Sequence, residues 1–137
     1  MPSVEPTTLN HMRKVYICRL PHFDYSSNGY YFVTIVSRLR LPIFAEHEDT
    51  VERIFRSVCR DLPGVTIDTM VVMPDHVHCI IVLDGVRLVL GEVIRRMKAK
   101  TSYVLGESCW QSNYYEHVIR SEQSLEYIRE YIRRNRS

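Results

Sequence analysis

Five runs along the chain have the hydrophobic pattern of β-strands. The clearest run, YYFVTIVS, is rich in β-branched and aromatic residues and follows the turn signal Asn28-Gly29. Two more runs, VTIDTMVVM and HVHCIIVL, are separated only by Pro74-Asp75, which predicts a hairpin whose second strand begins with a histidine. The predicted strands cover residues 15–20, 30–37, 65–73, 76–83 and 114–119.

Three other segments have the three- and four-residue hydrophobic spacing that is typical of amphipathic helices. In residues 48–62 the apolar positions recur on one face, and Pro63-Gly64 follows as a stop signal. A second helix is predicted for residues 90–105. The third spans residues 122–135, and Ser121 is placed to cap its first turn.

The order of these elements from residue 30 onwards is strand, helix, strand, strand, helix, strand, helix. This order predicts an α+β fold, a ferredoxin-like antiparallel sheet in the βαββαβ arrangement with helices on one face, followed by an extra C-terminal helix. The length of 137 residues favours a single domain, 1–137, in which residues 1–14 are expected to be flexible. Because this fold supports many activities, function has to be argued from a site.

Composition narrows the class of protein. Hydrophobic residues make up 45% and charged residues 25% of the chain, which is ordinary for a globular protein. The longest apolar runs fall short of the ~18 residues needed to span a bilayer, so we expect no membrane partner. The cysteines are far apart in sequence, which favours reduced thiols in a cytoplasmic protein. They are Cys18, Cys59, Cys79 and Cys109.

Charge is distributed unevenly along the chain. Residues 87–137 contain ten basic and six acidic side chains, whereas residues 1–86 contain eight basic and ten acidic side chains. This asymmetry indicates an anionic partner on one side of the molecule. A solvated polar helix face is the alternative for the basic residues of the second helix.

The segment MPDHVHCII contains the first candidate for chemistry. Side chains alternate along a strand, so His76 and His78 point to the same face while Val77 points to the other. Two neutral imidazoles on one face could bind a divalent cation, although a histidine in a strand is more often structural. Two ligands alone would hold a metal weakly, so a third is expected elsewhere.

The last predicted helix offers a candidate third ligand. Tyr131 and Asn135 are four residues apart and share a helical face, and an amide oxygen suits Mg²⁺ or Mn²⁺. The alternative, which the residues alone favour, is that this face simply packs the helix on the domain. The side chains that would do so are Tyr127, Ile128, Tyr131 and Ile132.

Several ordered blocks together resemble one family. They are GYYFVTIVSRLRLPIF, MPDHVHCII, LGEVIRRMKAKTS and WQSNYYEHVIRSEQSLEYIREYIRRN, and the likeness extends from Val15 to Asn135. The chain resembles the single-tyrosine HUH transposases, most closely the REP-associated tyrosine transposases and related small insertion-sequence enzymes. Members of this family commonly continue past the asparagine with a proline, whereas Arg136 and Ser137 follow it here.

The resemblance implies a set of residue roles. His76, His78 and Asn135 would bind the catalytic Mg²⁺ or Mn²⁺, and Tyr131 would be the nucleophile. The implied function is a DNA transposase that binds a DNA hairpin and cleaves and rejoins single-stranded DNA through a 5′-phosphotyrosine. The alternatives are a non-catalytic nucleic-acid-binding module of the same fold and, less favoured, an unrelated protein whose histidines bind metal.

Contacts with single-stranded or hairpin DNA are expected from basic and aromatic side chains. The basic candidates are Arg95, Arg96, Lys98 and Lys100 on the second helix and Arg129, Arg133 and Arg134 around the tyrosine. Trp110, Tyr114 or Tyr115 could stack on an unpaired base, although burial explains Trp110 equally well. Neither Tyr114 nor Tyr115 has an amide four residues later, so both rank below Tyr131 as nucleophile. A homodimer is also possible in this family.

Overall fold

The computed structural model describes residues 28–135, and its secondary structure follows the sequence pattern closely. Predicted and observed strand ends agree to within one residue, while the first predicted helix ends two residues earlier, at Arg60. The predicted strand at 15–20 and the predicted flexibility of 1–14 lie outside the described residues. The elements are β1 (Gly29–Val36), η3 (Arg38–Arg40), α2 (Glu48–Arg60), β2 (Val65–Met73), β3 (His76–Leu83), α3 (Leu90–Leu105), β4 (Tyr115–Ile119) and α4 (Glu122–Arg134).

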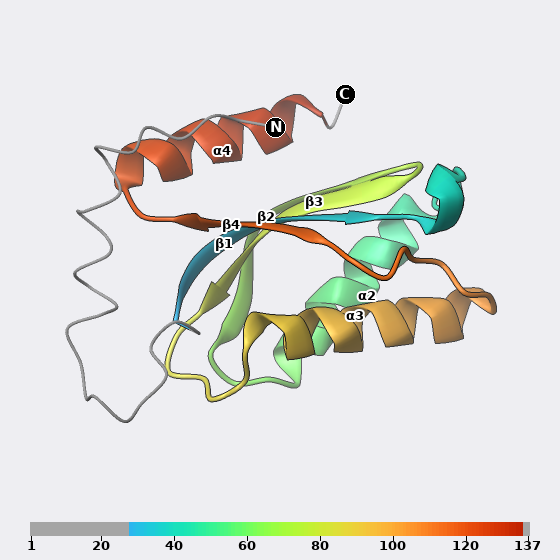
Figure 1. Cartoon of the computed structure of the whole chain (residues 1–137), viewed down its shortest axis with the longest axis horizontal. Helices are drawn as coiled ribbons and strands as arrows, with labels where there is room; N and C mark the ends of the chain where they lie inside the picture. Colours follow the sequence, from blue (N-terminus) through green and yellow to red (C-terminus); the bar gives the residue numbers. More distant parts are fainter. Residues whose placement is uncertain (1–27, 136–137) are drawn as a thin grey trace.

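Within residues 28–135 the strands form one antiparallel sheet in the order β2-β3-β1-β4 (Figure 1). The hairpin partners β2 and β3 lie side by side, β1 lies between β3 and β4, and all three pairings are antiparallel. Chain order and sheet order together match the predicted ferredoxin-like arrangement. The α+β fold class is therefore confirmed.

The helices cover both faces of this sheet. In Figure 1, α2 and α3 lie below the strands, whereas α4 lies above them. The larger hydrophobic core fills the space between the sheet and the α2/α3 layer, and a smaller core lies under α4. The predicted extra helix is thus present, and it packs on the face that the other two helices leave open.

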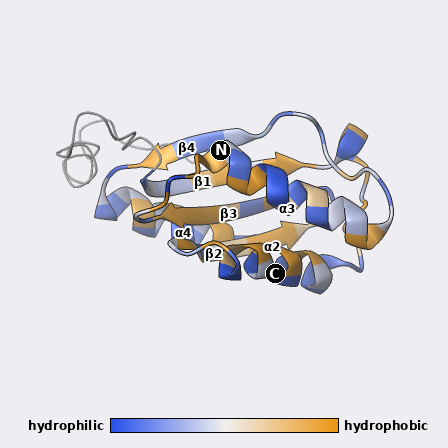
Figure 2. Cartoon of the chain, turned by 90° about the horizontal axis from the view of Figure 1, so that it is seen from below, coloured by the Kyte–Doolittle hydropathy of each residue, from blue (hydrophilic) through white to orange (hydrophobic). Residues whose placement is uncertain are grey.

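The α2 helix shows how the apolar spacing produces this packing. Its four most buried apolar side chains fall at positions i, i+3, i+4 and i+7, and all face the large core. In Figure 2 the strands are mainly hydrophobic in colour, whereas the helices carry both colours, as expected for elements with one buried face. The buried α2 side chains are Val51, Ile54, Phe55 and Val58.

The α4 helix is held to the sheet at its start and along its length. Ser121 caps the helix as predicted, because its Oγ accepts a hydrogen bond from the Ser124 backbone N–H at 3.1 Å. Two residues before Tyr131, the Arg129 guanidinium donates two hydrogen bonds, of 2.8 and 2.7 Å, to the Asp68 carboxylate. Asp68 lies at a register shift in β2, where an extra residue bulges out of the ladder.

Two further predictions concern the thiols and membranes. Cys59, Cys79 and Cys109 are free and buried, as predicted, and Cys18 lies outside the described residues. Among the helices of residues 28–135, none combines the length and the apolar character that a membrane span requires.

Candidate metal and tyrosine site

The two histidines of β3 lie side by side on the face that α4 covers. Alternation along the strand directs Val77 and Cys79 into the large core, where both are fully buried. It directs His76 and His78 the other way, and their ring centroids are 4.6 Å apart. The predicted pairing of these side chains is therefore present in the structure.

His78 is buried and contacts two side chains of β1. It is only 4% exposed, its ring stacks on Phe32 at a centroid distance of 5.5 Å, and its Nδ1 is 2.9 Å from the Thr34 hydroxyl. Burial, and secondarily the neighbouring His76, lowers the pKa of His78 to about 4. At neutral pH the ring is therefore uncharged, which is the state that binds a metal ion.

His76 has a different partner. Its Nδ1 lies 2.7 Å from Oδ1 of Asp75, which immediately precedes it in the hairpin turn. This hydrogen bond is the main reason that the pKa of Asp75 lies below its usual value. A carboxylate accepts only, so Nδ1 of His76 is the donor in this hydrogen bond, and in the neutral form of the ring the lone pair is on Nε2.

Tyr131 contacts His78 from α4 of the same chain. Its ring centroid is 5.5 Å from that of His78 and 6.1 Å from that of Phe32, in edge-to-face geometry. Tyr127, one turn earlier, is 52% exposed, so it does not share this packing. Ile128 and Ile132 are fully buried against the sheet, and the packing role considered for this helix face is correct for them.

Asn135 is the C-terminal capping residue of α4. Its Nδ2 donates a hydrogen bond of 2.9 Å to the Tyr131 carbonyl oxygen. It lines a cavity together with Met73 and Pro74, the residues that lead into the hairpin turn. Because Met73 pairs with His76 across the hairpin, Asn135 lies at the same end of the sheet as the histidine pair.

The imidazole nitrogens of His76 and His78 are of a type that binds divalent cations. Both imidazoles have Nδ1 engaged by a neighbouring oxygen, which leaves the two Nε2 atoms as the available ligand atoms. Within residues 28–135, no third His, Cys, Asp or Glu joins them in a cluster able to bind metal. A third protein ligand from this part of the chain would therefore have to be of another type, such as the amide of Asn135.

Comparison with known proteins identifies the family of this chain. The family model described as "Transposase IS200 like" matches residues 25–135. The chain belongs to this family of transposases. A relative described as an uncharacterized protein of Haemophilus influenzae is 31% identical over 163 residues, covering 93% of this chain and 89% of that protein.

Two solved structures share the fold of this IS200-like transposase. A REP-associated tyrosine transposase bound to a REP hairpin is 28% identical, with a TM-score of 0.70, over 80% of this chain and 67% of that chain. A protein of Deinococcus radiodurans R1 that has been assigned as a transposase is 19% identical, with a TM-score of 0.59, over 79% and 91% of the two chains. At that identity the second likeness bears on the fold alone.

The basic residues considered for DNA contacts fall on opposite faces of the transposase. Arg95 and Arg96 on α3 both bind Glu92, and Lys98 and Lys100 donate to oxygens of neighbouring segments. On α4, Arg129 is occupied by Asp68 and Glu126. Arg133 and Arg134 pair more loosely with Glu130, at 3.6 and 3.8 Å.

The three aromatic candidates for base stacking also lie in different environments. The Trp110 ring packs on Phe44 and Phe55, with centroid distances of 4.7 and 6.0 Å, so burial accounts for it. Tyr114 packs against the same large core. Tyr115 is 43% exposed and meets Phe32 edge-on, on the face that carries the histidines.

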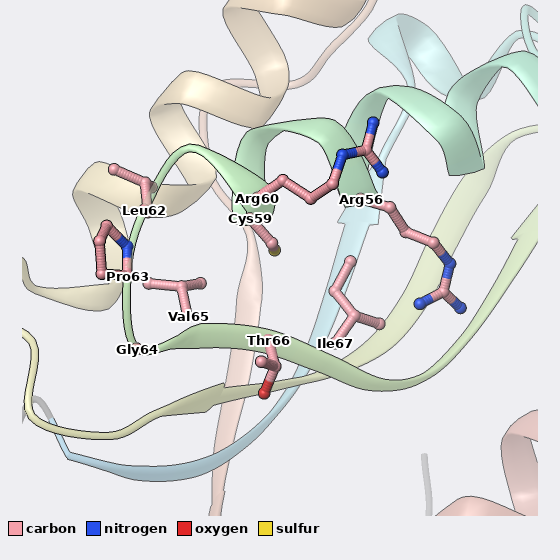
Figure 3. A pocket seen from close by; sticks show the side chains of 9 residues that line it. All are labelled: Arg56, Cys59, Arg60, Leu62, Pro63, Gly64, Val65, Thr66 and Ile67. Atoms are coloured by element: carbon pink, nitrogen blue, oxygen red, sulfur yellow. The ribbon is translucent and has the colours of Figure 1, made fainter.

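A cavity of about 420 Å³ between α2 and the start of β2 lies away from this site (Figure 3). Its lining includes Arg56, Arg60 and Ile67. Val65 of the same cavity pairs with Leu83 at the far end of β3 from His76. None of the predicted site residues lines it.

Three residues of the site were not predicted from the sequence: Phe32, Thr34 and Asp75. Strand alternation puts Phe32 and Thr34 on one face of β1, but only the register of β1 against β3 pairs Thr34 with His78. Asp75 could have been noticed as a carboxylate next to a candidate ligand, since such histidines commonly donate their other ring N–H to a carboxylate.

Proposed function

We propose that this transposase binds a DNA hairpin and cleaves and rejoins single-stranded DNA through a 5′-phosphotyrosine intermediate, with a divalent metal ion. The observation that carries the proposal is the contact between the Tyr131 and His78 rings, 5.5 Å apart within one chain. The family membership and the hairpin bound to the 28% identical relative support it.

We infer that His76, His78 and Asn135 bind Mg²⁺ or Mn²⁺. In both histidines the hydrogen bond to a neighbouring oxygen involves Nδ1, so Nε2 is available as a ligand atom. Asn135 lies at the same end of the sheet. When bound, the cation would polarise the phosphate and offset the charge that develops during attack. For Asn135 to become a ligand, its amide oxygen must turn toward the histidines, whether or not its Nδ2 keeps the hydrogen bond to the Tyr131 carbonyl oxygen.

Tyr131 supplies the nucleophile in this proposal. Its hydroxyl oxygen bonds to the phosphorus while the bond from phosphorus to the 3′ oxygen breaks. The phenol proton leaves Tyr131, the released strand ends in a 3′-hydroxyl, and the other strand end is held as a 5′-phosphotyrosine. Because the phosphotyrosine is itself an ester, a 3′-hydroxyl can attack it and rejoin DNA without a nucleotide cofactor.

The DNA would be held by basic side chains around the site. Arg133 and Arg134 lie close to Tyr131 on the tyrosine helix, and their side chains are 55% and 78% exposed, so they are the first candidates for phosphate contacts. Tyr115 is the candidate to stack on an unpaired base, because it is exposed beside Phe32. The basic residues of α3 would contact only DNA that also reaches the opposite face of the sheet.

Labelled hairpin oligonucleotides with single-stranded flanks test the proposal. With Mg²⁺ or Mn²⁺, label at the 3′ end should move with the protein as a covalent adduct, while label at the 5′ end is released with a 3′-hydroxyl. Tyr131→Phe should abolish the adduct. Tyr127→Phe is the matched control, because Tyr127 lies one turn earlier on α4 and is exposed.

Two results would overturn parts of this proposal. An adduct that survives Tyr131→Phe would place the nucleophile elsewhere. Hairpin binding without cleavage under any divalent metal, together with indifference to His76→Ala, would instead establish a non-catalytic DNA-binding module of the same fold.

A further inference from the structure

Asp75 connects the histidine pair to a loop on the other side of the hairpin turn. Its Oδ1 lies 2.7 Å from Nδ1 of His76, and its Oδ2 lies 3.5 Å from a terminal guanidinium nitrogen of Arg40. The Asp75 side chain is about two-thirds buried, so both contacts are partly screened from water. Arg40, Asp75 and His76 thus form a continuous chain of polar contacts.

The loop that carries Arg40 has an unusual backbone. Leu39 and Arg40 have φ angles of 56° and 54°, in the left-handed region that residues other than glycine rarely adopt. Leu39 is also 75% exposed, so burial of its side chain does not explain this conformation. Strain of this kind persists only where surrounding contacts impose it, and it gathers at functional sites.

Main-chain contacts impose this conformation and attach the loop to the turn. The Ser37 N–H donates to the Asp75 carbonyl oxygen at 2.9 Å, and the Arg40 N–H donates to the Ser37 carbonyl oxygen at 3.0 Å. The Ser37 hydroxyl donates to the Leu41 carbonyl oxygen at 2.7 Å. These contacts use no atom of the Asp75 or Arg40 side chains, so the loop can keep its shape when either side chain is removed.

We propose that Asp75 and Arg40 are positioning residues that prepare His76 to bind the divalent cation. This inference rests on the proposed function. The Asp75 carboxylate accepts a hydrogen bond from the Nδ1–H of His76 and so favours the tautomer whose lone pair is on Nε2, and Arg40 holds the carboxylate in place.

The two histidines therefore differ in how they are held. His78 is paired with a neutral hydroxyl and is locked by burial and by Phe32, whereas His76 depends on a charged carboxylate at the edge of the site. A carboxylate behind the ring also raises the basicity of the ligand and adds negative charge near the cation. Loss of the Asp75 side chain should consequently affect His76 and leave His78 unchanged.

The first readout needs no metal ion. Long-range ¹H–¹⁵N NMR spectra of the imidazole nitrogens should show the Nδ1–H tautomer for His76 in the wild-type protein. Asp75→Ala should convert His76 to a mixture containing the Nε2–H form, while the His78 signals stay in place as an internal reference. Asp75→Asn keeps an accepting oxygen and should restore the Nδ1–H form.

The second readout is the affinity for Mn²⁺ alone, measured by calorimetry on the full chain. Asp75→Ala should weaken Mn²⁺ binding by roughly 10- to 100-fold, Asp75→Asn by less, and Arg40→Ala by a smaller factor still. Asp61→Ala and Arg60→Ala are the matched controls, since both side chains are exposed at the far end of α2. Unfolding curves of every variant exclude a general loss of structure.

The outcomes separate this inference from the proposed function. If His76→Ala abolishes Mn²⁺ binding but Asp75→Ala changes neither the His76 tautomer nor the Mn²⁺ affinity by more than about twofold, the positioning role is wrong while the metal site stands. If His76→Ala leaves Mn²⁺ binding unchanged, the metal site itself is wrong. Detection of the Nε2–H tautomer of His76 in the wild-type protein would contradict the positioning role directly.

Discussion

The two faces of the sheet differ in the side chains that they bury. On the α2/α3 face, inward-pointing side chains of β1 and β3 such as Val33, Ile35 and Val77 are fully buried in one large apolar core. On the α4 face, the same two strands present Thr34, His76 and His78 next to a smaller apolar cluster.

The difference shows where this fold can accommodate chemistry. The large core stabilises the sheet by burying apolar side chains, so the opposite face can carry polar side chains that contribute little apolar burial. The two histidines of β3 are still hydrogen-bonded, because each has an oxygen partner at Nδ1. Variants on the two faces should therefore separate stability from activity.

The largest effect is expected for His76→Ala on the α4 face. DNA cleavage and Mn²⁺ binding should fall below detection, while the free energy of unfolding changes by about 1 kcal/mol or less, because no large core side chain is removed. His117→Ala is the matched control, because it removes another histidine of the same sheet, on β4. The Nε2 of His117 is buried without a hydrogen-bond partner among the described residues. Cleavage that needs His117 as much as His76 would contradict the assignment.

Phe55→Ala tests the opposite face. Phe55 is fully buried under Trp110, so its truncation should cost about 3–5 kcal/mol of unfolding free energy. Cleavage per folded molecule should stay at the wild-type rate, which urea unfolding and single-turnover assays on the folded fraction can measure together. Ile128→Ala, under α4, should instead reduce both quantities, because Ile128 packs the tyrosine helix on the sheet.

A third, intermediate effect is expected where the α4 helix is tied to β2. Asp68→Asn removes the charge that binds Arg129 and should cost about 2 kcal/mol at neutral pH. The Arg129 guanidinium is the main reason that the pKa of Asp68 is lowered. A lowered pKa stabilises the folded state above the unfolded-state value near 4, and this stabilisation is lost as the pH falls through the folded-state pKa.

Urea unfolding at several pH values checks this sign. The gap between wild type and Asp68→Asn should be widest near pH 7 and should narrow at pH 3 and below. A gap of equal size at every pH would mean that the Asp68 carboxylate charge has no part in holding α4.

The smallest effect concerns the basic residues on the two faces. Replacing Arg133 and Arg134 by Ala should weaken binding of a single-stranded oligonucleotide several-fold and lower the salt slope by up to about 2. Replacing Arg95 and Arg96 should change this binding less, because the α3 helix that carries them lies on the face of the sheet opposite α4. Equal losses in fluorescence anisotropy titrations would show that DNA contacts both faces.

Much of the fold could be predicted because it depends on local pattern. The hairpin around Pro74-Asp75, the α3 boundaries and the Ser121 cap all match their predictions. The η3 loop could not be predicted, since its left-handed residues are a leucine and an arginine rather than glycine or asparagine. Its conformation depends on bonds to the distant hairpin turn.

The candidate site was predictable only in part. Alternation in β3 placed His76 and His78 on one face, and the family resemblance pointed to Tyr131 and Asn135. The placement of α4 over that face depends on tertiary contacts such as the one between Asp68 and Arg129, which are 61 residues apart in the chain. The partners of the histidines likewise depend on strand register and turn geometry.

The most direct test of the account is to identify the residue that carries the DNA. Trypsin separates Tyr131 from the other candidate tyrosines: Tyr131 lies in residues 130–133, Tyr127 in 121–129, and Tyr114 and Tyr115 together in 101–120. After cleavage with Mn²⁺ and nuclease trimming, mass spectrometry should find the nucleotide phosphate on Tyr131. A nucleotide on any of the other three tyrosines, with Tyr131 unmodified, would contradict the account.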